Sequence, residues 1–472
     1  MNILVLNCGS SSVKFQFIRM EDEAVLAKGL VEKIGSTGAN FIYDAAGRRS
    51  VRDQAEVPNH EAAIDLVLST LTHARDGVIR SVEEVDGVGH RLVHGAEEFN
   101  ASCLITDEVK SQIEACSKFA PLHNPHNLKG IEVAERLIPG KLQVAVFDTA
   151  FHSRMPPESF LYAIPFGLYK KLGIRRYGFH GTSHKFVAQR AAEVLERPLE
   201  EIKLITCHLG NGASLAAIRE GRSVDTSMGF TPLEGLMMGT RSGDLDPAVV
   251  GYLMERENLK PGEVDTILNK RSGLLGITEG ANDMREVIEC MIEGRERHTL
   301  AYRMFCRRVK KYIGAYAALL GGVDALVFTG GIGENSALVR RDILAGLKCL
   351  GFELDERANE ENRRMITRGR VPALVIPTNE ELAIARDARE IIEKSLAAAE
   401  GQEEGADYAE ELSSLTPADR RELVLLWSAD PTANPLRLQE RFTHKTGKRL
   451  SLGSLQYELV RMGLKEKEES NA

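Results

Sequence analysis

The chain has no cysteine pattern of the kind that holds a metal or a disulfide framework. Its seven cysteines, at positions 8, 103, 116, 207, 290, 306 and 349, are odd in number and scattered. They form no C-x-x-C motif and no Cys/His spacing suited to zinc. Most of them adjoin apolar residues, as reduced and buried thiols do in a cytosol. A zinc-ribbon or disulfide-stapled fold is therefore excluded.

Long apolar runs are also missing. No segment approaches the roughly 18 apolar residues of a membrane span. The apolar run at residues 2–6 is too short for the core of a signal peptide, and no basic segment precedes it. We therefore expect a cytoplasmic protein without a membrane segment.

Positive charge is not in excess. The 472 residues contain 60 Lys and Arg against 68 Asp and Glu, a formal net charge of −8. This balance argues against a protein built wholly to bind nucleic acid or an anionic membrane, although a few local cations can still hold a small anion. The length predicts roughly three domains, and 43% hydrophobic and 27% charged residues are ordinary for a globular protein.

The two commonest nucleotide fingerprints are absent. The sequence contains no G-x-x-x-x-G-K-[ST], which excludes a P-loop. The segment Gly331-Ile332-Gly333 lacks the third glycine and the acidic partner of a dinucleotide-binding motif. A Rossmann oxidoreductase is therefore disfavoured.

Glycine clusters follow several apolar runs. The strand-like run at 2–6 leads through Gly9 into an alternating run at 13–18. The same pattern returns 201 residues later, where 204–207 leads through Gly210 into 215–218. A third apolar run, 325–329, precedes a glycine-rich turn and a helical pattern. With helices predicted at 61–73, 183–195 and 300–320, this indicates two similar α/β domains facing a cleft.

Each glycine-rich turn has two interpretations. It can be a simple turn, or its exposed backbone N–H groups can hold phosphate. Histidines provide a second signal, because eight of the twelve lie at 90, 94, 123, 126, 152, 180, 184 and 208. Several of these stand in loops beside Gly, Arg or Asp, which is typical of a polar active site. The zinc motifs H-E-x-x-H and H-x-x-E-H do not occur.

From residue 1 to about 396 the chain resembles the acetate kinases, the acetokinase branch of the sugar kinase, heat-shock protein and actin superfamily. The resemblance rests on many motifs in order: NCGSSSVKF (7–15), GHRLVHG (89–95), PLHNPHN (121–127), FDTAFH (147–152), RYGFHGTSH (176–184), HLGNGAS (208–214), DTSMGFTPLEGLMMGTRSGDLDP (225–247), GGIGENS (330–336) and PTNEELAIARD (377–387). It implies a duplicated two-domain actin/sugar-kinase-like α/β fold with a central cleft.

The resemblance implies reversible, magnesium-dependent transfer of the ATP γ-phosphoryl group to the carboxylate of acetate, giving acetyl phosphate and ADP. Arg91 and Arg241 match the arginines that hold the acyl carboxylate and the transferring phosphoryl group, a task that suits guanidinium groups. His180 matches a transition-state donor to phosphoryl oxygen. Asp148 matches the catalytic aspartate, and we expect it to orient an arginine or a metal-bound water, because acetate needs no general base near neutral pH.

The resemblance also implies three sets of binding residues. The acyl site would be formed by Arg91, Val93, Leu122, His123, Phe179 and Pro232. The ATP/ADP site would be formed by Lys14, His208, Leu209, Gly210, Asn211, Gly212, Asp283, Met284, Arg285, Gly331, Ile332, Gly333, Glu334 and Asn335. Asn7 and Glu380 would serve Mg²⁺, or Mn²⁺ in its place. Since a pocket distinguishes one methylene by only about 1–3 kcal/mol, propionate or butyrate is the alternative acyl substrate.

We expect an N-terminal α/β domain at 1–150, completed by a helix at 382–398, and a second α/β domain at 151–381 with the nucleotide site. A linker at 399–411 would lead to a small all-α extension at 412–472 with helix starts at Thr416-Pro417 and Asn434-Pro435 and a third helix from Ser451 to Gly463. Residues 415–465 hold nine Lys/Arg against five Asp/Glu, and 438–464 resembles a helix-turn-helix module.

Two interpretations of this extension remain: a module that docks DNA or a protein partner, and a helical appendage packed on the kinase or its dimer mate. Family members are usually homodimers, so the resemblance implies a homodimer.

Overall fold

The computed structural model describes residues 1–36, 38–45, 51–121, 123–413, 415–429, 435–448, 450, 454–455, 458–459 and 462. The chain divides into two compact units, Met1–Ile391 and Ile392–Ala472. The first unit carries both β-sheets and every site residue predicted from the sequence.

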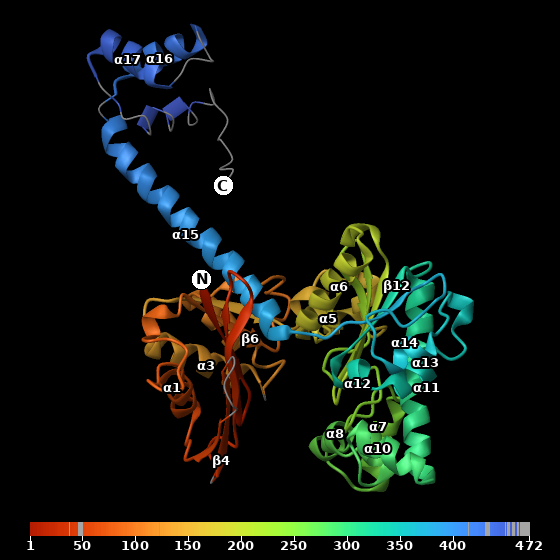
Figure 1. Cartoon of the computed structure of the whole chain (residues 1–472). Helices are drawn as coiled ribbons and strands as arrows, with labels where there is room; N and C mark the ends of the chain where they lie inside the picture. Colours follow the sequence, from red (N-terminus) through yellow and green to blue (C-terminus); the bar gives the residue numbers. More distant parts are fainter. Residues whose placement is uncertain are drawn as a thin grey trace. The chain divides into compact units, whose positions relative to one another are not determined.

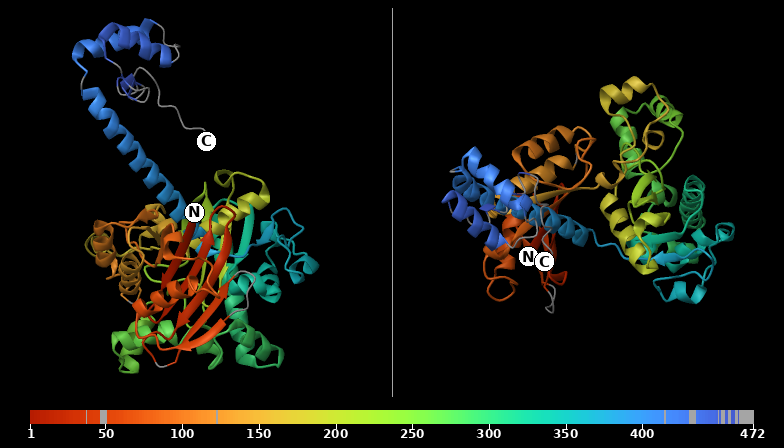
Figure 2. Two further views of the ribbon diagram at one scale, coloured as in Figure 1. Left: turned by 60° about the vertical axis from the view of Figure 1, so that its left-hand side comes forward. Right: turned by 90° about the horizontal axis from the view of Figure 1, so that it is seen from above.

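The first unit contains two mixed sheets (Figures 1 and 2). The first sheet has, in spatial order, β5 (Val51–Ala55), β4 (Ala39–Ala45), β3 (Ala24–Glu32), β2 (Ser12–Arg19), β1 (Asn2–Cys8), β6 (Gly87–Leu92), β8 (Leu142–Phe147) and β7 (Cys103–Leu104). The second has β11 (Arg222–Thr226), β10 (Ala213–Arg219), β9 (Leu204–Leu209), β12 (Ala325–Thr329) and β13 (Ala373–Val375).

The two sheets repeat one topology. In each, an N-terminal hairpin (β1–β2 or β9–β10) is extended by a third antiparallel strand on one side. On the other side its first strand pairs in parallel with a later strand, β6 in one sheet and β12 in the other. That strand pairs in parallel with a further one, β8 or β13. The predicted duplication of an α/β domain is thus confirmed.

Helices cover both faces of the first sheet. α1 (His60–Leu71) and α3 (Asn124–Leu137) lie together on one face (Figure 1) and bury a cluster that includes Phe15 and Val88. α2 (Asp107–Cys116) packs beside α3. Gly89, next to Val88 in β6, faces the opposite side, where a β-carbon would lie only 2.7 Å from Ile384 Cγ2. Alternation along one strand therefore seats the first turns of α15 (Glu380–Ser413) on the second face.

The second sheet is covered by α6 (Gly181–Leu195) on one face and by α11 (Glu296–Leu319) with its neighbours on the other. The other helices of this unit are α4 (Pro157–Phe160), α5 (Phe166–Leu172), α7 (Ala248–Arg256), α8 (Pro261–Lys270), α9 (Gly273–Thr278), α10 (Met284–Ile292), α12 (Gly330–Asn335), α13 (Ala337–Leu344) and α14 (Glu356–Glu360). Leu382 and Ala383 pack against the α6 cluster. The first turns of α15 therefore touch elements of both sheets, which places Glu380 where the two domains meet.

The second unit contains α16 (Pro417–Ala429) and α17 (Pro435–Thr446), both of which start at the prolines predicted from the sequence. The helix predicted from Ser451 to Gly463 falls largely outside the described residues. Residues 399–411, expected to be a linker, are instead helical as part of α15. Their Ala- and Glu-rich composition has high helix propensity, which explains the difference.

All seven cysteines are free thiols, and five of them are buried. Among the described helices, none is long and apolar enough to cross a membrane.

Candidate active site

Arg91 and Asp148 form an ion pair at the carboxyl ends of two neighbouring strands. β6 and β8 run in parallel with Leu92 opposite Phe147, so the ends of both strands meet. Arg91 Nε and Nη2 donate to the two oxygens of Asp148 at 3.0 and 2.7 Å. Burial raises the pKa of the Asp148 carboxyl, and the contact with Arg91 offsets this only in part. The pair forms a buried, bidentate anchor for the guanidinium group.

Glu380, the first residue of α15, adds a second carboxylate to Arg91. Its Oε2 lies 3.8 Å from Arg91 Nε. Burial alone would raise the pKa of Glu380, but the nearby charges of Arg91, His208 and Lys14 lower it. Lys14 itself forms an ion pair with the next residue, Glu381. Charges from β2, β6, β8 and α15 thus gather at one place.

His180 lies at the start of α6 in a left-handed conformation with φ of 56°. Its Nδ1 is 2.9 Å from Ser214 Oγ, and its ring stacks on His208 with 4.3 Å between centroids. Burial, together with the charges of neighbouring histidines and of Arg91 and Arg241, lowers the pKa of His180 well below 6.5. At neutral pH the ring is therefore uncharged and carries one N–H.

Arg241 has a different environment from Arg91. Its Nη1 donates to the carbonyl oxygen of Pro232 at 3.3 Å, and burial lowers its pKa. Within the described residues, Arg241 makes no ion pair with a carboxylate. A β-carbon at Gly212 would lie 3.5 Å from His180 Nε2 and 3.7 Å from Arg241 Nη1, so these two side chains flank the same glycine. The site thus holds one guanidinium available for an anion.

The remaining acyl-site candidates lie around these groups. Burial and the charges of Arg91 and Arg241 lower the pKa of His123, which places this ring near both arginines. Val93 and Phe179 pack in one apolar cluster, with Phe179 almost fully buried. Leu122 lies outside the described residues. The described candidates therefore put an apolar wall beside two cations.

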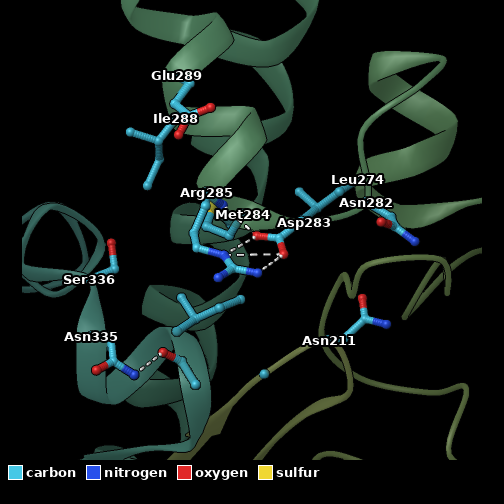
Figure 3. Close-up of a pocket in the computed structure, with 13 residues that line it drawn as sticks. Asn211, Leu274, Asn282, Asp283, Met284, Arg285, Ile288, Glu289, Asn335 and Ser336 are labelled. Atoms are coloured by element: carbon cyan, nitrogen blue, oxygen red, sulfur yellow. Dashed lines mark hydrogen bonds and ion pairs between the residues drawn. The ribbon is translucent and has the colours of Figure 1, made fainter. Parts of the chain in front are cut away.

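A separate cavity of about 750 Å³ lies between α10, α12 and the β9–β10 turn (Figure 3). Eight predicted nucleotide-site residues line it: Gly210, Asn211, Asp283, Met284, Arg285, Gly331, Ile332 and Asn335. Asp283 caps α10 and pairs with Arg285, whose Nη2 is 2.6 Å from Asp283 Oδ2. Leu274, Ile288 and Ile332 give the cavity apolar surface next to these charges. This combination suits a flat heterocycle carrying polar groups.

The glycines at the start of α12 have different tasks. At Gly330, φ is +76° and a β-carbon would meet the backbone of Leu209 at 2.8 Å, so only glycine fits. Gly331 lines the cavity, and no atom lies within 4 Å of the position of its missing β-carbon, so its backbone is open to a ligand. Glu334 turns inward, where its Oε1 accepts from the Gly330 and Thr378 amides at 2.8 and 3.1 Å.

The other predicted nucleotide-site residues do not line this cavity: Lys14, His208, Leu209, Gly212, Gly333 and Glu334. His208 and Lys14 lie instead near Glu380, as their effect on its pKa shows. Five further lining residues were not predicted from the sequence: Leu274, Asn282, Ile288, Glu289 and Ser336. Ile288 could have been found, because it stands one helical turn after Met284 in an amphipathic segment.

Oxygen donors for a metal gather near Arg91. Asp148 and Glu380 both approach its guanidinium group, and Asn7 in β1 pairs with Lys14, whose side chain reaches the start of α15. In the described part of the chain, no three His, Cys, Asp or Glu side chains are grouped as a metal site. Mg²⁺ commonly takes one or two carboxylates and completes its shell with water and substrate phosphates, so this donor set fits it.

The extension has its own apolar core, which includes Leu423, Leu438 and Phe442. Three of its basic side chains pair with acidic residues of the same unit. These pairs are Arg420–Glu458, Lys445–Glu422 and Lys448–Asp419. Part of its positive charge is therefore neutralised internally.

Comparison with known proteins agrees with this geometry. The model of the acetokinase family matches residues 2–386. The acetate kinase of Halothermothrix orenii is 55% identical over 397 residues, which cover 83% of this chain and 100% of that protein.

Solved structures give the same result. The Porphyromonas gingivalis acetate kinase is 47% identical with a TM-score of 0.81, and the Francisella tularensis propionate kinase is 41% identical with a TM-score of 0.78. Each alignment covers 83% of this chain and 99% of the other. The chain belongs to the acetokinase family.

Proposed function

We propose that the chain is an ATP:acetate phosphotransferase, which reversibly forms acetyl phosphate and ADP. The observation that carries this proposal is the environment of Arg241. Its guanidinium group is partly buried and has no carboxylate partner among the described residues. It lies next to Gly212, as does the neutral ring of His180. A buried cation without a counter-ion is costly unless an anionic ligand meets it. Acetate and a transferring phosphoryl group are such ligands.

The side chains divide the work of phosphoryl transfer, which depends mainly on positioning and on stabilising charge. Arg91, held by Asp148, presents a fixed guanidinium face, and Arg241 meets the developing negative charge. His180 donates from Nε2 to a phosphoryl oxygen. Asp148 acts by orienting Arg91, because acetate is already ionised at neutral pH and needs no base.

The nucleotide and the metal complete the site. The 750 Å³ cavity would hold the adenosine moiety, with phosphates directed along the Gly210–Gly212 turn and Gly331. Asn7 and Glu380 would hold Mg²⁺, with Mn²⁺ as a substitute. When bound, this ion neutralises charge on the phosphates.

Family membership alone does not distinguish acetate from propionate, since one solved relative is a propionate kinase. Val93, Phe179 and Pro232 favour a short acid. A hydroxamate-trapping assay with ATP and Mg²⁺ should give acyl phosphate with the highest kcat/KM for acetate among formate, acetate, propionate and butyrate. Absence of acyl phosphate from every acid would refute the proposed reaction.

Arg241→Ala provides a direct test of the assigned role. Removing a group that stabilises developing charge should lower kcat roughly 10²-fold or more. Arg285→Ala, on the exposed rim of the nucleotide cavity, should act mainly on the KM for ATP. An Arg241→Ala enzyme with normal kcat would show that this side chain has no part in the transition state.

We further propose that the protein is cytoplasmic and that it forms a homodimer. Light scattering of the purified chain would test the dimer. For the extension we propose a structural or protein-docking role, because three of its basic residues are paired internally. DNA binding is the alternative. Retention of the full chain, but not of residues 1–401, on a DNA column at low salt would favour that alternative.

A further inference from the structure

A line of hydrogen bonds lies behind the ring of His180. Thr206 Oγ1 is 2.7 Å from His184 Nδ1, and His184 Nε2 is 2.8 Å from Ser214 Oγ. The same Ser214 Oγ is 2.9 Å from His180 Nδ1. Thr206, His184 and Ser214 have no exposed surface. Four side chains, those of Thr206, His184, Ser214 and His180, are thus joined in one unbranched series of hydrogen bonds that ends at the site. We call this series the relay.

The fold sets this series through two simple spacings. His180 and His184 are four residues apart at the start of α6, so they lie on one helix face. In the β9–β10 hairpin Ala216 pairs with Thr206, and Ser214 is two residues from Ala216 on the same face of the sheet. The two hydroxyls therefore stand beside the two rings.

The rings must be treated as neutral. Burial and neighbouring positive groups lower the pKa of both His180 and His184 well below 6.5. A neutral imidazole has one N–H donor and one acceptor nitrogen. Each hydroxyl has a single hydrogen, and the buried Ser214 hydroxyl needs an acceptor for it. Ser214 therefore donates to one ring and accepts from the other, so the series can run in only one of two directions.

Thr206 decides the direction. In the described part of the chain, its Oγ1 has no hydrogen-bond partner other than His184 Nδ1. If His184 Nδ1 carried the proton, the Thr206 hydroxyl hydrogen would be buried without an acceptor, which is unfavourable. Thr206 therefore donates to His184 Nδ1, His184 Nε2–H donates to Ser214, and Ser214 donates to His180 Nδ1.

We propose that Thr206, His184 and Ser214 are positioning residues that hold His180 in the tautomer with its proton on Nε2. This proposal rests on the proposed phosphotransferase function. Nε2 is the nitrogen beside Gly212 and Arg241. With the proton there, His180 donates to phosphoryl oxygen without reorganisation, whereas the other tautomer would turn a lone pair toward an anion.

Ser214→Ala is the first test, with Ser227→Ala as the matched control. Ser227 is equally buried, but its Oγ accepts from the Leu215 amide and, within the described residues, forms no hydrogen bond with a histidine. Ser214→Ala should lower kcat roughly 10-fold or more and leave the KM for acetate and ATP nearly unchanged, as loss of an orienting partner does elsewhere. Ser227→Ala should retain the wild-type kcat.

Thr206 gives a more remote test. Thr206→Val removes the hydroxyl at constant shape and should also lower kcat, and Thr206→Ser should restore it. Equal kcat in the wild type, Ser214→Ala and Thr206→Val would overturn the proposal.

The ring tautomer itself can be measured by nitrogen-15 NMR of histidine-labelled protein, without turnover. The expected wild-type spectrum has His180 and His184 protonated at Nε2 only, and Ser214→Ala should change the His180 signals. Protonation of His180 at Nδ1 would overturn the relay even in an active kinase. Conversely, an Nε2-protonated ring in a chain that forms no acyl phosphate would refute the proposed function and leave the relay intact.

Discussion

His152 makes the stability of this fold sensitive to acid. Its ring has no exposed surface and lies between two fixed partners. Nε2 donates to the carbonyl oxygen of Phe179 at 3.0 Å, and Nδ1 is 2.7 Å from the Ser223 hydroxyl. Burial lowers the pKa of His152 to about 4. Because the Phe179 carbonyl directly precedes His180, this contact also supports the active-site loop.

The sign and size of the effect follow from this pKa. Above pH 6.5 the ring is neutral in both the folded and unfolded chain, and its contribution to stability is complete. Between pH 6.5 and 4 the unfolded chain binds a proton that the folded chain does not, so the free energy of unfolding falls as the pH falls. A shift of about 2.5 pH units corresponds to roughly 3 kcal/mol for this one side chain.

Urea unfolding at pH 7.5, 6 and 5 measures this contribution in the wild type and in His152→Gln. The variant should be less stable at pH 7.5, since it loses ring packing, but its stability should depend less on pH. The gap between the two proteins should therefore narrow on acidification, by about 2 kcal/mol at pH 5. His73→Gln is the control, because the His73 side chain is 58% exposed. A gap that stays constant with pH, or a His73 variant that narrows equally, would refute the reasoning.

Three further outcomes are expected. Asp148→Asn should lower kcat strongly and raise the KM for acetate in the hydroxamate assay, because it leaves Arg91 without its bidentate partner. Val93→Ala should enlarge the acyl pocket and raise kcat/KM for propionate relative to acetate, by about 10-fold for one to two methylenes of space. A chain ending at residue 398 should keep its kcat within about two-fold, since the Halothermothrix orenii relative aligns over its full length to 83% of this chain.

The sequence predicts the layered architecture well, because its evidence is local. An apolar run, a glycine turn and an alternating run define a hairpin wherever they occur. The repeat of this pattern at Gly9 and Gly210 predicted two related domains, and the matching strand orders confirm it. The glycine-rich segments also predicted much of the nucleotide cavity, since Gly210 and Gly331 line it.

The relay behind His180 has no comparable signal in the sequence. Thr206 and Ser214 are small hydroxyl residues in apolar strands, and such residues occur in most buried sheets. Their contacts with His184 depend on the β9–β10 register and on the rotation of α6, both of which are set by tertiary packing. The same holds for Lys14, whose partner Glu381 is more than 360 residues away.

The two arginines of the site, Arg91 and Arg241, have different environments, although the sequence predicts the same role for both. Arg91 faces two carboxylates, Asp148 and Glu380, so its charge is already more than balanced and its main asset is a fixed orientation. Among the described residues, Arg241 has no carboxylate partner and contacts the Pro232 carbonyl oxygen and the Met238 sulfur. Burial lowers its pKa, so its charged form is stabilised less than that of Arg91 before a ligand arrives. The attraction between Arg241 and negative charge on the substrates can therefore increase more during the reaction than that of Arg91. A group whose stabilisation grows between substrate and transition state accelerates the chemical step, so we expect Arg241 to govern kcat and Arg91 to govern substrate orientation.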